Sequence, residues 1–273
     1  MKGKAAELFS VRPSNRKIFY RDVLETLNES KIGYLVGGGH ALELHSGISR
    51  QPKDLDLFVR PADAEVTLRK LAEKHYKTEL CHPHWLGKIF YQKDFIDLIF
   101  SSGNGVCLVD DDWFENSVGG QLFEVPVNFC PPEEMIWSKA FVMERERYDG
   151  ADVAHLMRAC AARLDWRRLL ARFGPHWRVL LSHLILFGYI YPSQRSLVPA
   201  PVMEALLNRL RNEQGEPLSK SHECRGTLLS RTQYRDDVEA WGYVDARQQP
   251  CGSMSAEEAA QWTAAGEKQV RSE

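Results

Sequence analysis

The stretch YLVGGGHALELHSGISRQPKDLDLFV, residues 34–59, places three glycines after a hydrophobic strand and two aspartates one residue apart in a second strand. Side chains in a strand alternate between its faces, so Asp54 and Asp56 share one face. At about 3.3 Å rise per residue, their Cα atoms lie roughly 6–7 Å apart. Two carboxylates at that distance repel unless water or a cation lies between them. Their hard oxygen ligands predict a Mg²⁺ or Mn²⁺ site, whereas the alternative is a solvated strand edge.

The glycines Gly37, Gly38 and Gly39 precede a segment of helical composition that Gly47 closes. Free backbone N–H groups at a helix start attract phosphate, and missing Cβ atoms let the phosphate come close. This is neither a Walker loop nor a dinucleotide fingerprint, because no Gly-Lys-Ser/Thr follows and G-x-G-x-x-G is missing. His40 is a candidate nucleotide contact, with a capping or surface histidine as the alternative.

Composition limits the number of domains and the class of protein that we expect. The chain has 273 residues, 44% hydrophobic and 26% charged, which is enough for one large domain or two small ones. The net charge of −2 provides no overall basic field for nucleic acid. Six scattered cysteines without a C-x-x-C pair argue against a zinc ribbon or a disulfide framework. The polar N-terminus and the short apolar run at 179–191 predict a cytoplasmic protein with no membrane partner.

The periodicity along the chain predicts an α/β (α+β) fold, in which flanking helices cover a small mixed sheet. Helices are expected over 15–30, 40–47 and 61–76, and strands over 32–38, 53–60 and 121–132. A hairpin is expected over 87–102, turning near residues 92–94. From Pro132 onward the patterns are helical, with almost no strand signal. We therefore expect a mixed unit at 1–130, a helical domain at 131–230 and a polar tail at 231–273, helical or disordered.

These motifs resemble the signature of the nucleotidyltransferase superfamily with the polymerase-beta-like fold. Gly38-Gly39 and Asp54-Leu55-Asp56 match its two parts, and Arg50 resembles an arginine of the branch with abortive-infection type toxins. The resemblance implies that residues 1–130 are a catalytic domain of this type. The chain departs from the pattern in two ways: fourteen residues separate Gly39 from Asp54, and Pro52 stands where Thr or Ser is frequent.

The resemblance further implies a third carboxylate, for which Asp97 in DFIDLIF is the match, and a lysine that neutralises triphosphate, matched by Lys139. For Asp97 the alternative is a surface-facing residue of an amphipathic strand, and for Lys139 a solvent-exposed helix position. The later helix of that branch carries a lysine followed by an acidic stretch, which this region resembles also through Arg147, Asp149 and Asp152. For these three the alternative, which we favour, is a helix-face charge cluster with no direct part in catalysis.

The implied reaction moves a nucleoside monophosphate from an NTP to an acceptor and releases pyrophosphate. Asp54 and Asp56 would hold one Mg²⁺ or Mn²⁺ on the triphosphate, and with Asp97, which is also the candidate general base, they would hold a second. The acceptor is tRNA, protein or a small hydroxyl compound, and a toxin-type enzyme would have a cognate antitoxin as partner. The alternative, motivated by Pro52 and the long spacer, is a degenerate fold that binds nucleotide or acts as an interaction module.

Two other segments carry open alternatives. CHPHW, residues 81–85, is either a zinc site or a loop, and its lack of a distant partner pair favours the loop. RLDWRRLLARFGPHWR, residues 163–178, interleaves arginines with tryptophans. It is either an RNA-binding surface or an amphipathic packing helix, and its leucine spacing favours packing.

Overall fold

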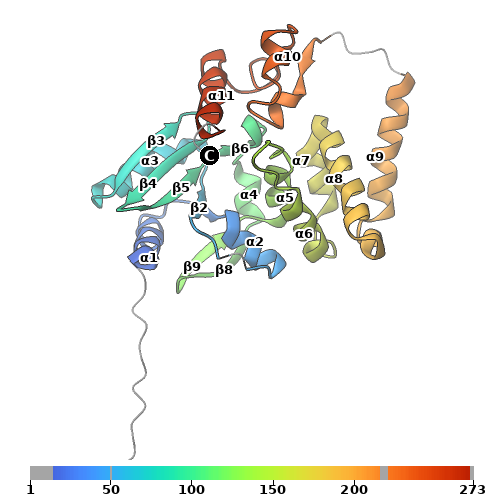
Figure 1. Ribbon diagram of the computed structural model, residues 1–273. Coiled ribbons are helices and arrows are strands. Elements are labelled where there is room, and N and C mark those ends of the chain that lie inside the picture. The colour runs from blue at the N-terminus through green and yellow to red at the C-terminus, as the bar shows by residue number, and fades with distance from the viewer. Residues whose placement is uncertain (1–14, 50, 216–220, 271–273) are drawn as a thin grey trace, which may run out of the picture.

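A seven-stranded mixed sheet forms the centre of the protein, seen here in a computed structural model that describes residues 15–49, 51–215 and 221–270 (Figure 1). The strand order is β3-β4-β5-β2-β1-β9-β8. The β1–β9 and β2–β5 pairs are parallel and the others antiparallel, which confirms the expected mixed sheet. The strands are β1 Leu35–Val36, β2 Leu55–Phe58, β3 Lys77–His82, β4 Leu86–Tyr91, β5 Asp94–Ile99, β8 Val118–Leu122 and β9 Val125–Phe129.

Local sequence signals account for most elements of this first half. The first helix buries Phe19, Val23 and Leu27, which recur at helical spacing. Pro61 begins the third helix, where its missing N–H costs no hydrogen bond. Gly47 ends the second helix in the left-handed region, at φ 72°. The elements are α1 Asn15–Glu29, α2 Gly38–Ser46, α3 Pro61–Glu73, α4 Asp111–Glu115, and the two-residue strands β6 Ser101–Ser102 and β7 Cys107–Leu108.

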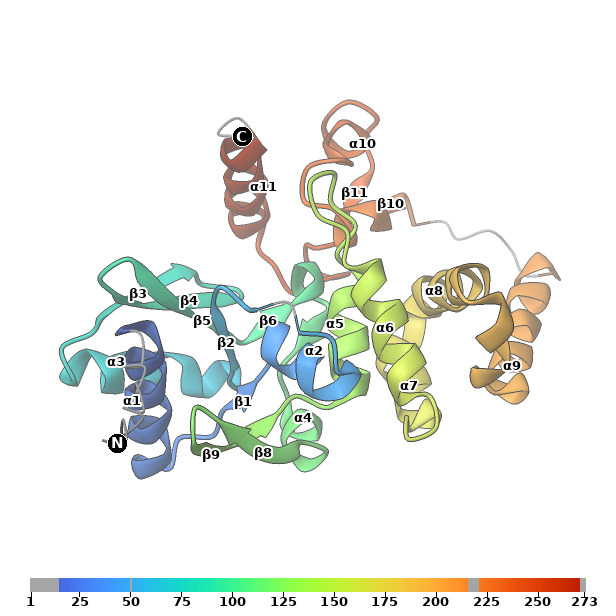
Figure 2. The ribbon, with the colours of Figure 1, turned by 60° about the horizontal axis from the view of Figure 1, so that its bottom comes forward.

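The second half is a group of helices beside the sheet (Figure 2). The sequence pattern over 132–160 reads as one helical stretch, but the structure divides it into two helices. Residues 141–149 form a loop in which Met143 and Tyr148 pair in an isolated bridge. The helices are α5 Pro132–Ala140, α6 Gly150–Cys160, α7 Trp166–Phe173, α8 Trp177–Ile190 and α9 Ala200–Asn212. Short 3₁₀ turns occur at Gly103–Gly105, Gly174–His176, Pro192–Leu197, Glu213–Gly215 and Arg225–Leu228.

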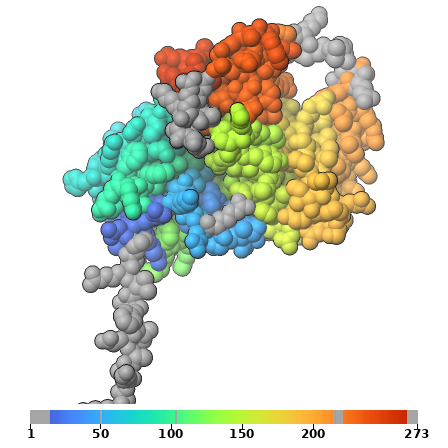
Figure 3. All heavy atoms as spheres, in the orientation of Figure 1, coloured from blue at the N-terminus to red at the C-terminus, as the bar shows by residue number. Residues whose placement is uncertain are grey.

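The C-terminal segment folds back onto the body of the protein. It contains β10 Glu223–Cys224, α10 Arg235–Glu239, β11 Val244–Asp245 and α11 Ala256–Val270, so the final stretch is helical and two short strands occur that the pattern did not predict. Both ribbon views place α11 at the ends of β4 and β5, near β6. In Figure 3 the orange and red segment rests on the yellow-green region around residues 141–149. The domain boundaries at 130/131 and 230/231 stay predictions.

One continuous core of buried side chains runs from α1 and the sheet into α5–α9. Strands β2 and β5 contribute to it through the residues that flank their aspartates, since Leu55, Leu57, Ile96 and Leu98 are fully buried. Alternation then turns the polar side chains of both strands to the opposite face of the sheet. Among the described residues, no helix is both long and apolar enough to cross a bilayer.

Candidate active site

Three carboxylates meet on one face of the sheet. Strands β2 and β5 pair in parallel with Asp56 opposite Asp97, and Asp54 precedes Asp56 by two residues. One carboxylate oxygen from each residue lies within 4.8 Å of those of the other two. Within the described part of the chain, this is the one group of three or more acidic, cysteine or histidine side chains with such geometry. Two segments about 40 positions apart in the sequence therefore build one cluster.

The three carboxylates of the cluster repel one another. Burial, together with the charges of Asp54 and Asp97, raises the pKa of Asp56 to about 7. Burial also raises the pKa of Asp97, and the hydrogen bond from Lys88 opposes that shift. The Lys88 Nζ atom, on β4, donates to Asp97 Oδ1 at 2.6 Å. A divalent cation would remove the remaining repulsion, and oxygen donors suit Mg²⁺ or Mn²⁺.

The glycine turn lies directly against these carboxylates. The backbone N–H of Gly37 donates to the carbonyl oxygen of Asp56 at 2.9 Å. A Cβ atom on Gly38 would lie 1.6 Å from Asp56 Oδ2, and Gly38 has a φ of +53°, so both space and backbone require glycine there. A Cβ atom on Gly39 would lie 2.8 Å from Cγ of Pro52. The unusual proline is thus packed against the third glycine, and the start of α2 adjoins Asp56.

The other candidate residues are placed differently. His40 sets its ring edge-on to Phe123 at 5.6 Å between centroids, and burial lowers the pKa of His40, so the ring is neutral at pH 7. Arg50 lies outside the described residues. Lys139 faces the same cavity as the carboxylates, and its side chain is only 12% exposed, so the solvent-exposed interpretation is wrong.

Lys139 is already engaged by acidic partners. Its Nζ donates to Asp149 Oδ2 at 2.9 Å and to Asp152 Oδ2 at 2.8 Å. Arg147 contacts the same Asp149 carboxylate through Nε and Nη2, each at 2.9 Å. These residues do not form a helix-face cluster, because Arg147 lies in the loop between α5 and α6 and the group surrounds Lys139.

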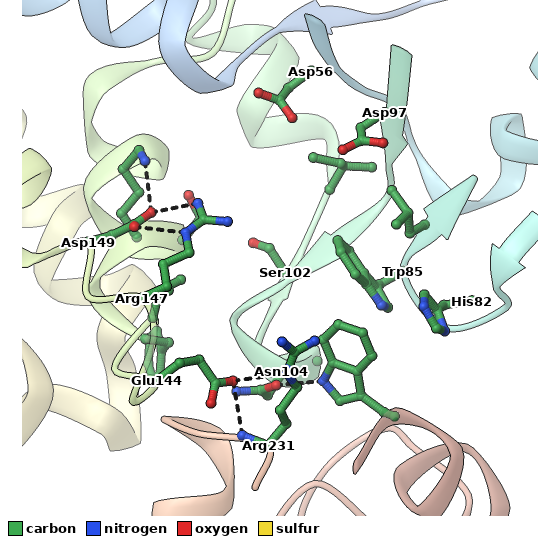
Figure 4. Close-up of a pocket in the computed structure, with 18 of the residues that line it drawn as sticks. Asp56, His82, Trp85, Asp97, Ser102, Asn104, Glu144, Arg147, Asp149 and Arg231 are labelled. Carbon is green, nitrogen blue, oxygen red and sulfur yellow. Dashed lines mark hydrogen bonds and ion pairs between the residues drawn. The ribbon is translucent and has the colours of Figure 1, made fainter. Parts of the chain in front are cut away.

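A cavity of about 470 Å³ connects the carboxylates to a second wall (Figure 4). Asp56 and Asp97 lie at one end, and Arg147 with Asp149 lies at the side. The far end is lined by aromatic and polar residues from the β3–β4 turn, the 102–105 region and the C-terminal segment, among them His82, Trp85, Asn104, Arg231 and Trp262. The C-terminal part of the chain therefore contributes to the same cavity as the carboxylates.

Sequence reasoning missed Lys88, Arg231 and Trp262. Lys88 had a usable signal, because a hairpin turning at residues 92–93 places Lys88 opposite Asp97. Arg231 and Trp262 had none, since their approach depends on how the C-terminal segment packs.

The CHPHW segment is the end of β3 followed by a tight turn, where the ring of His82 stacks on Trp85 at 5.9 Å. Its side chains take part in aromatic packing, and the loop interpretation is correct only for the residues after His82.

The arginine-rich segment at 163–178 packs inside the protein, which confirms the packing interpretation. Arg168 binds Glu133 and Glu134, and Arg172 binds Glu134 and Asp110, all through short ion pairs. Trp177 is 3% exposed. Arg168, Arg172 and Trp177 are thus used in packing, whereas Arg163, Arg167 and Arg178 of the same segment are exposed.

No protein-family model and no curated protein matches the chain. Several solved structures do. One is an antigenic nucleotidyltransferase-like protein from Paracoccidioides brasiliensis, with 15% identity, 67% of this chain and 92% of that chain covered, and a TM-score of 0.46. Another is the antibiotic-resistance factor ANT(2'')-Ia, with 16% identity, 61% and 95% coverage, and a TM-score of 0.42. A third is the lincosamide antibiotic adenylyltransferase LnuA, with 14% identity, 52% and 96% coverage, and a TM-score of 0.36.

Proposed function

We propose that this protein is a divalent-metal-dependent nucleotidyltransferase, which moves a nucleoside monophosphate from an NTP to a hydroxyl acceptor and releases pyrophosphate. One observation carries the proposal: Asp54, Asp56 and Asp97 place carboxylate oxygens within 4.8 Å of one another beside a glycine turn. A purely structural cluster would have cationic partners to match. Here Asp97 has Lys88, and the raised pKa of Asp56 reflects repulsion from its two acidic neighbours in addition to burial.

Different residues of the chain would bind the metal, bind the phosphate and accept the proton. The three carboxylates would hold Mg²⁺ or Mn²⁺, which when bound neutralises the polyphosphate and polarises its phosphorus–oxygen bonds. The N-terminal end of α2 adjoins Asp56, and the positive end of its dipole would attract a phosphate there. Lys88 orients the Asp97 carboxylate through Oδ1. Asp97 then accepts the proton of the attacking hydroxyl as the new oxygen–phosphorus bond forms and the bond to pyrophosphate breaks.

The test measures transfer from labelled NTPs with Mg²⁺ to tRNA, protein extract and small hydroxyl compounds. Asp56→Asn keeps the side-chain shape against Gly38 but removes the charge, and transfer should fall at least about 100-fold. Asp94→Asn is the matched control, because Asp94 begins the same strand as Asp97 but binds Arg16 instead. Equal transfer by wild type and Asp56→Asn would refute the proposed mechanism. Growth arrest on expression, relieved by a neighbouring gene product, would assign the toxin type.

A second candidate function is a degenerate fold that binds nucleotide without transferring it. The engagement of Lys139 by Asp149 and Asp152 favours it, since that lysine would have to exchange partners to meet a phosphate. Calorimetry with each NTP, with and without Mg²⁺, separates the two functions. Metal-independent binding without turnover supports the degenerate module, and binding that requires Mg²⁺ supports the enzyme.

A further inference from the structure

The far end of the cavity is an aromatic wall, defined here as His82, His84, Trp85 and Trp262. The Trp262 ring centroid lies 4.9 Å from that of His82 and 5.0 Å from that of Trp85, in edge-to-face contacts. In Figure 4, Trp85 and His82 lie on the Asp97 side of the cavity. Two segments that are 177 positions apart, at 85 and 262, therefore make one surface.

The C-terminal half of this wall is held by specific contacts. Trp262 Nε1 donates to Asn104 Oδ1 at 2.8 Å, and the guanidinium of Arg231 lies 4.7 Å over the Trp262 ring. Glu144 accepts hydrogen bonds from the Ser230 hydroxyl at 2.6 Å and from the Arg231 backbone N–H at 3.0 Å. Hydrogen bonds thus tie the segment to the loop after α5 and to the 103–105 turn, so Trp262 is placed with a defined orientation.

The wall presents polar atoms that the described part of the protein does not satisfy. Both ring nitrogens of His84, the indole Nε1 of Trp85 and the hydroxyl of Ser102 are buried without a hydrogen-bond partner there. All three residues line the cavity. Buried polar groups normally have partners, and an unsatisfied set in one cavity indicates a ligand that supplies them. The set contains both donors and acceptors, so the matching ligand must offer both.

The charges around the cavity fit an uncharged ring better than a phosphate backbone. Lys88 contacts Asp97, Lys139 and Arg147 contact Asp149, and Arg231 contacts Glu146. A groove for single-stranded nucleic acid needs cationic side chains directed at phosphates. Here each of these cations meets a carboxylate, while aromatic side chains line the cavity.

The strand order decides which substrate meets this wall. The order β4-β5-β2-β1 places the β3–β4 turn with Trp85 on the Asp97 side of the carboxylates and the glycine turn on the Asp56 side. In-line transfer requires the entering oxygen and the leaving pyrophosphate to lie on opposite sides of the phosphorus. With the polyphosphate at the glycine turn, the entering hydroxyl comes from the side of the aromatic wall.

We propose that the aromatic wall is the acceptor subsite, and that the acceptor is a small hydroxyl compound with a flat unsaturated ring stacked against Trp85 and Trp262. This inference rests on the proposed nucleotidyl transfer. The acceptor's hydroxyl oxygen bonds to the α-phosphorus as the bond to pyrophosphate breaks, and its proton passes to Asp97. Trp262 makes the C-terminal segment a specificity-determining part of the enzyme.

The experiment measures binding in two steps. First, the full-length protein with Mg²⁺ is titrated with the non-hydrolysable α,β-methylene analogues of the four NTPs, and the tightest is kept at saturation. Second, calorimetry follows adenosine and tyrosinamide as ring probes, with glucose as the hydroxyl compound that lacks a flat ring. We expect at least one ring probe to bind about tenfold or more tightly than glucose, and Trp262→Ala or Trp85→Ala to weaken it about tenfold or more.

Gln261→Ala is the matched control on α11, because the Gln261 side chain is exposed and contacts Glu257 of the same helix. It should leave probe binding unchanged. If Trp262→Ala disturbs the fold of the C-terminal segment, Trp262→Phe retains a flat ring while removing the indole N–H donor, and should keep probe binding within about threefold.

Three results would overturn the inference. If the ring probes bind no better than glucose, the aromatic wall is not an acceptor subsite. Loss of analogue binding in Trp262→Ala, with probe binding intact, would assign the wall to the nucleotide's base. Displacement of the ring probe by an RNA oligonucleotide would assign it to a nucleic-acid acceptor. Absence of Mg²⁺-dependent analogue binding in the first step refutes the proposed function itself, and the inference with it.

Discussion

The helical half and the sheet half of this protein treat buried charge in opposite ways. In the helical half, the fully buried carboxylate of Glu134 is bound by Arg168 at 2.6 Å and by Arg172 at 3.0 Å. On the sheet, three carboxylates converge around Asp56, and Lys88 contacts Asp97. The carboxylate that packs between helices is paired with arginines. The three carboxylates on the sheet repel one another, and the fold tolerates that repulsion. On the function we propose, a divalent cation would relieve this repulsion.

The neutralised network also links the two halves. Arg172, 9% exposed, reaches from α7 to Asp110 at the start of α4, at 2.6 Å. Its guanidinium lies 5.2 Å from the ring centre of Trp137. Glu134 is fully buried, so losing both of its arginine partners would leave a buried charge uncompensated, which is the costly way to break an ion pair. The predictions below test whether the two groups of charges behave as differently as their surroundings indicate.

The largest effect is expected from breaking the neutralised network. Glu134→Ala removes the buried partner that Arg168 and Arg172 share, although Arg168 keeps Glu133 and Arg172 keeps Asp110, and the free energy of unfolding should fall by about 3 kcal/mol in urea denaturation. Glu213→Ala removes the partner of Arg178 in a surface pair and should cost less than about 1 kcal/mol. Similar losses in both variants would contradict a special role for the buried network.

Mg²⁺ binding should distinguish the cluster of Asp54, Asp56 and Asp97 from the ion-paired carboxylates of the helical half. Mg²⁺ at 100 times its dissociation constant should stabilise the wild type by about 2.7 kcal/mol, observed as a rise in Tm. Asp56→Asn should abolish that rise and, in EDTA, should match or exceed the wild-type Tm because it relieves repulsion. A variant that still gains stability from Mg²⁺ would show that the metal binds elsewhere.

Gly38→Ala tests the close approach of the glycine turn to Asp56. The left-handed φ of +53° costs alanine roughly 1–2 kcal/mol, and the new methyl group would displace the Asp56 carboxylate. Gly47→Ala is the control: its φ is +72°, and its Cβ would meet nothing within 4 Å. Gly38→Ala should lose more stability in EDTA than Gly47→Ala because of this clash, and only Gly38→Ala should lose the Tm rise with Mg²⁺. If both variants lost the Tm rise with Mg²⁺, the loss would come from backbone strain and not from the contact between Gly38 and Asp56.

The smallest effect is the pH dependence of the metal-free protein. Folding raises the pKa of Asp56 to about 7, so the folded state binds a proton that the unfolded chain releases near pH 4. Stability from this proton is fully present below pH 4 and is lost as pH rises through 7. The Tm in EDTA should therefore fall between about pH 4 and pH 7 and level off above pH 7, and the fall should be shallower in Asp56→Asn. An equal slope in both proteins would place the titrating group elsewhere.

The sequence by itself determined the features that depend on neighbours along the chain. Alternation in KDLDLFV put Asp54 and Asp56 on one face, Gly47 and Pro61 marked helix ends, and the hairpin turned within the expected residues 92–94. These signals are local because side-chain periodicity and turn geometry are properties of a few consecutive residues.

Only the tertiary structure decided which distant segments meet. The parallel pairing of β2 with β5 brought Asp97 to Asp56, the break between α5 and α6 gave Lys139 its acidic partners, and the returning C-terminal segment brought Trp262 into the cavity. Each contact joins residues that no local period connects. It forms because the chain closes a loop to bury apolar surface, and the best burial depends on every other element of the core.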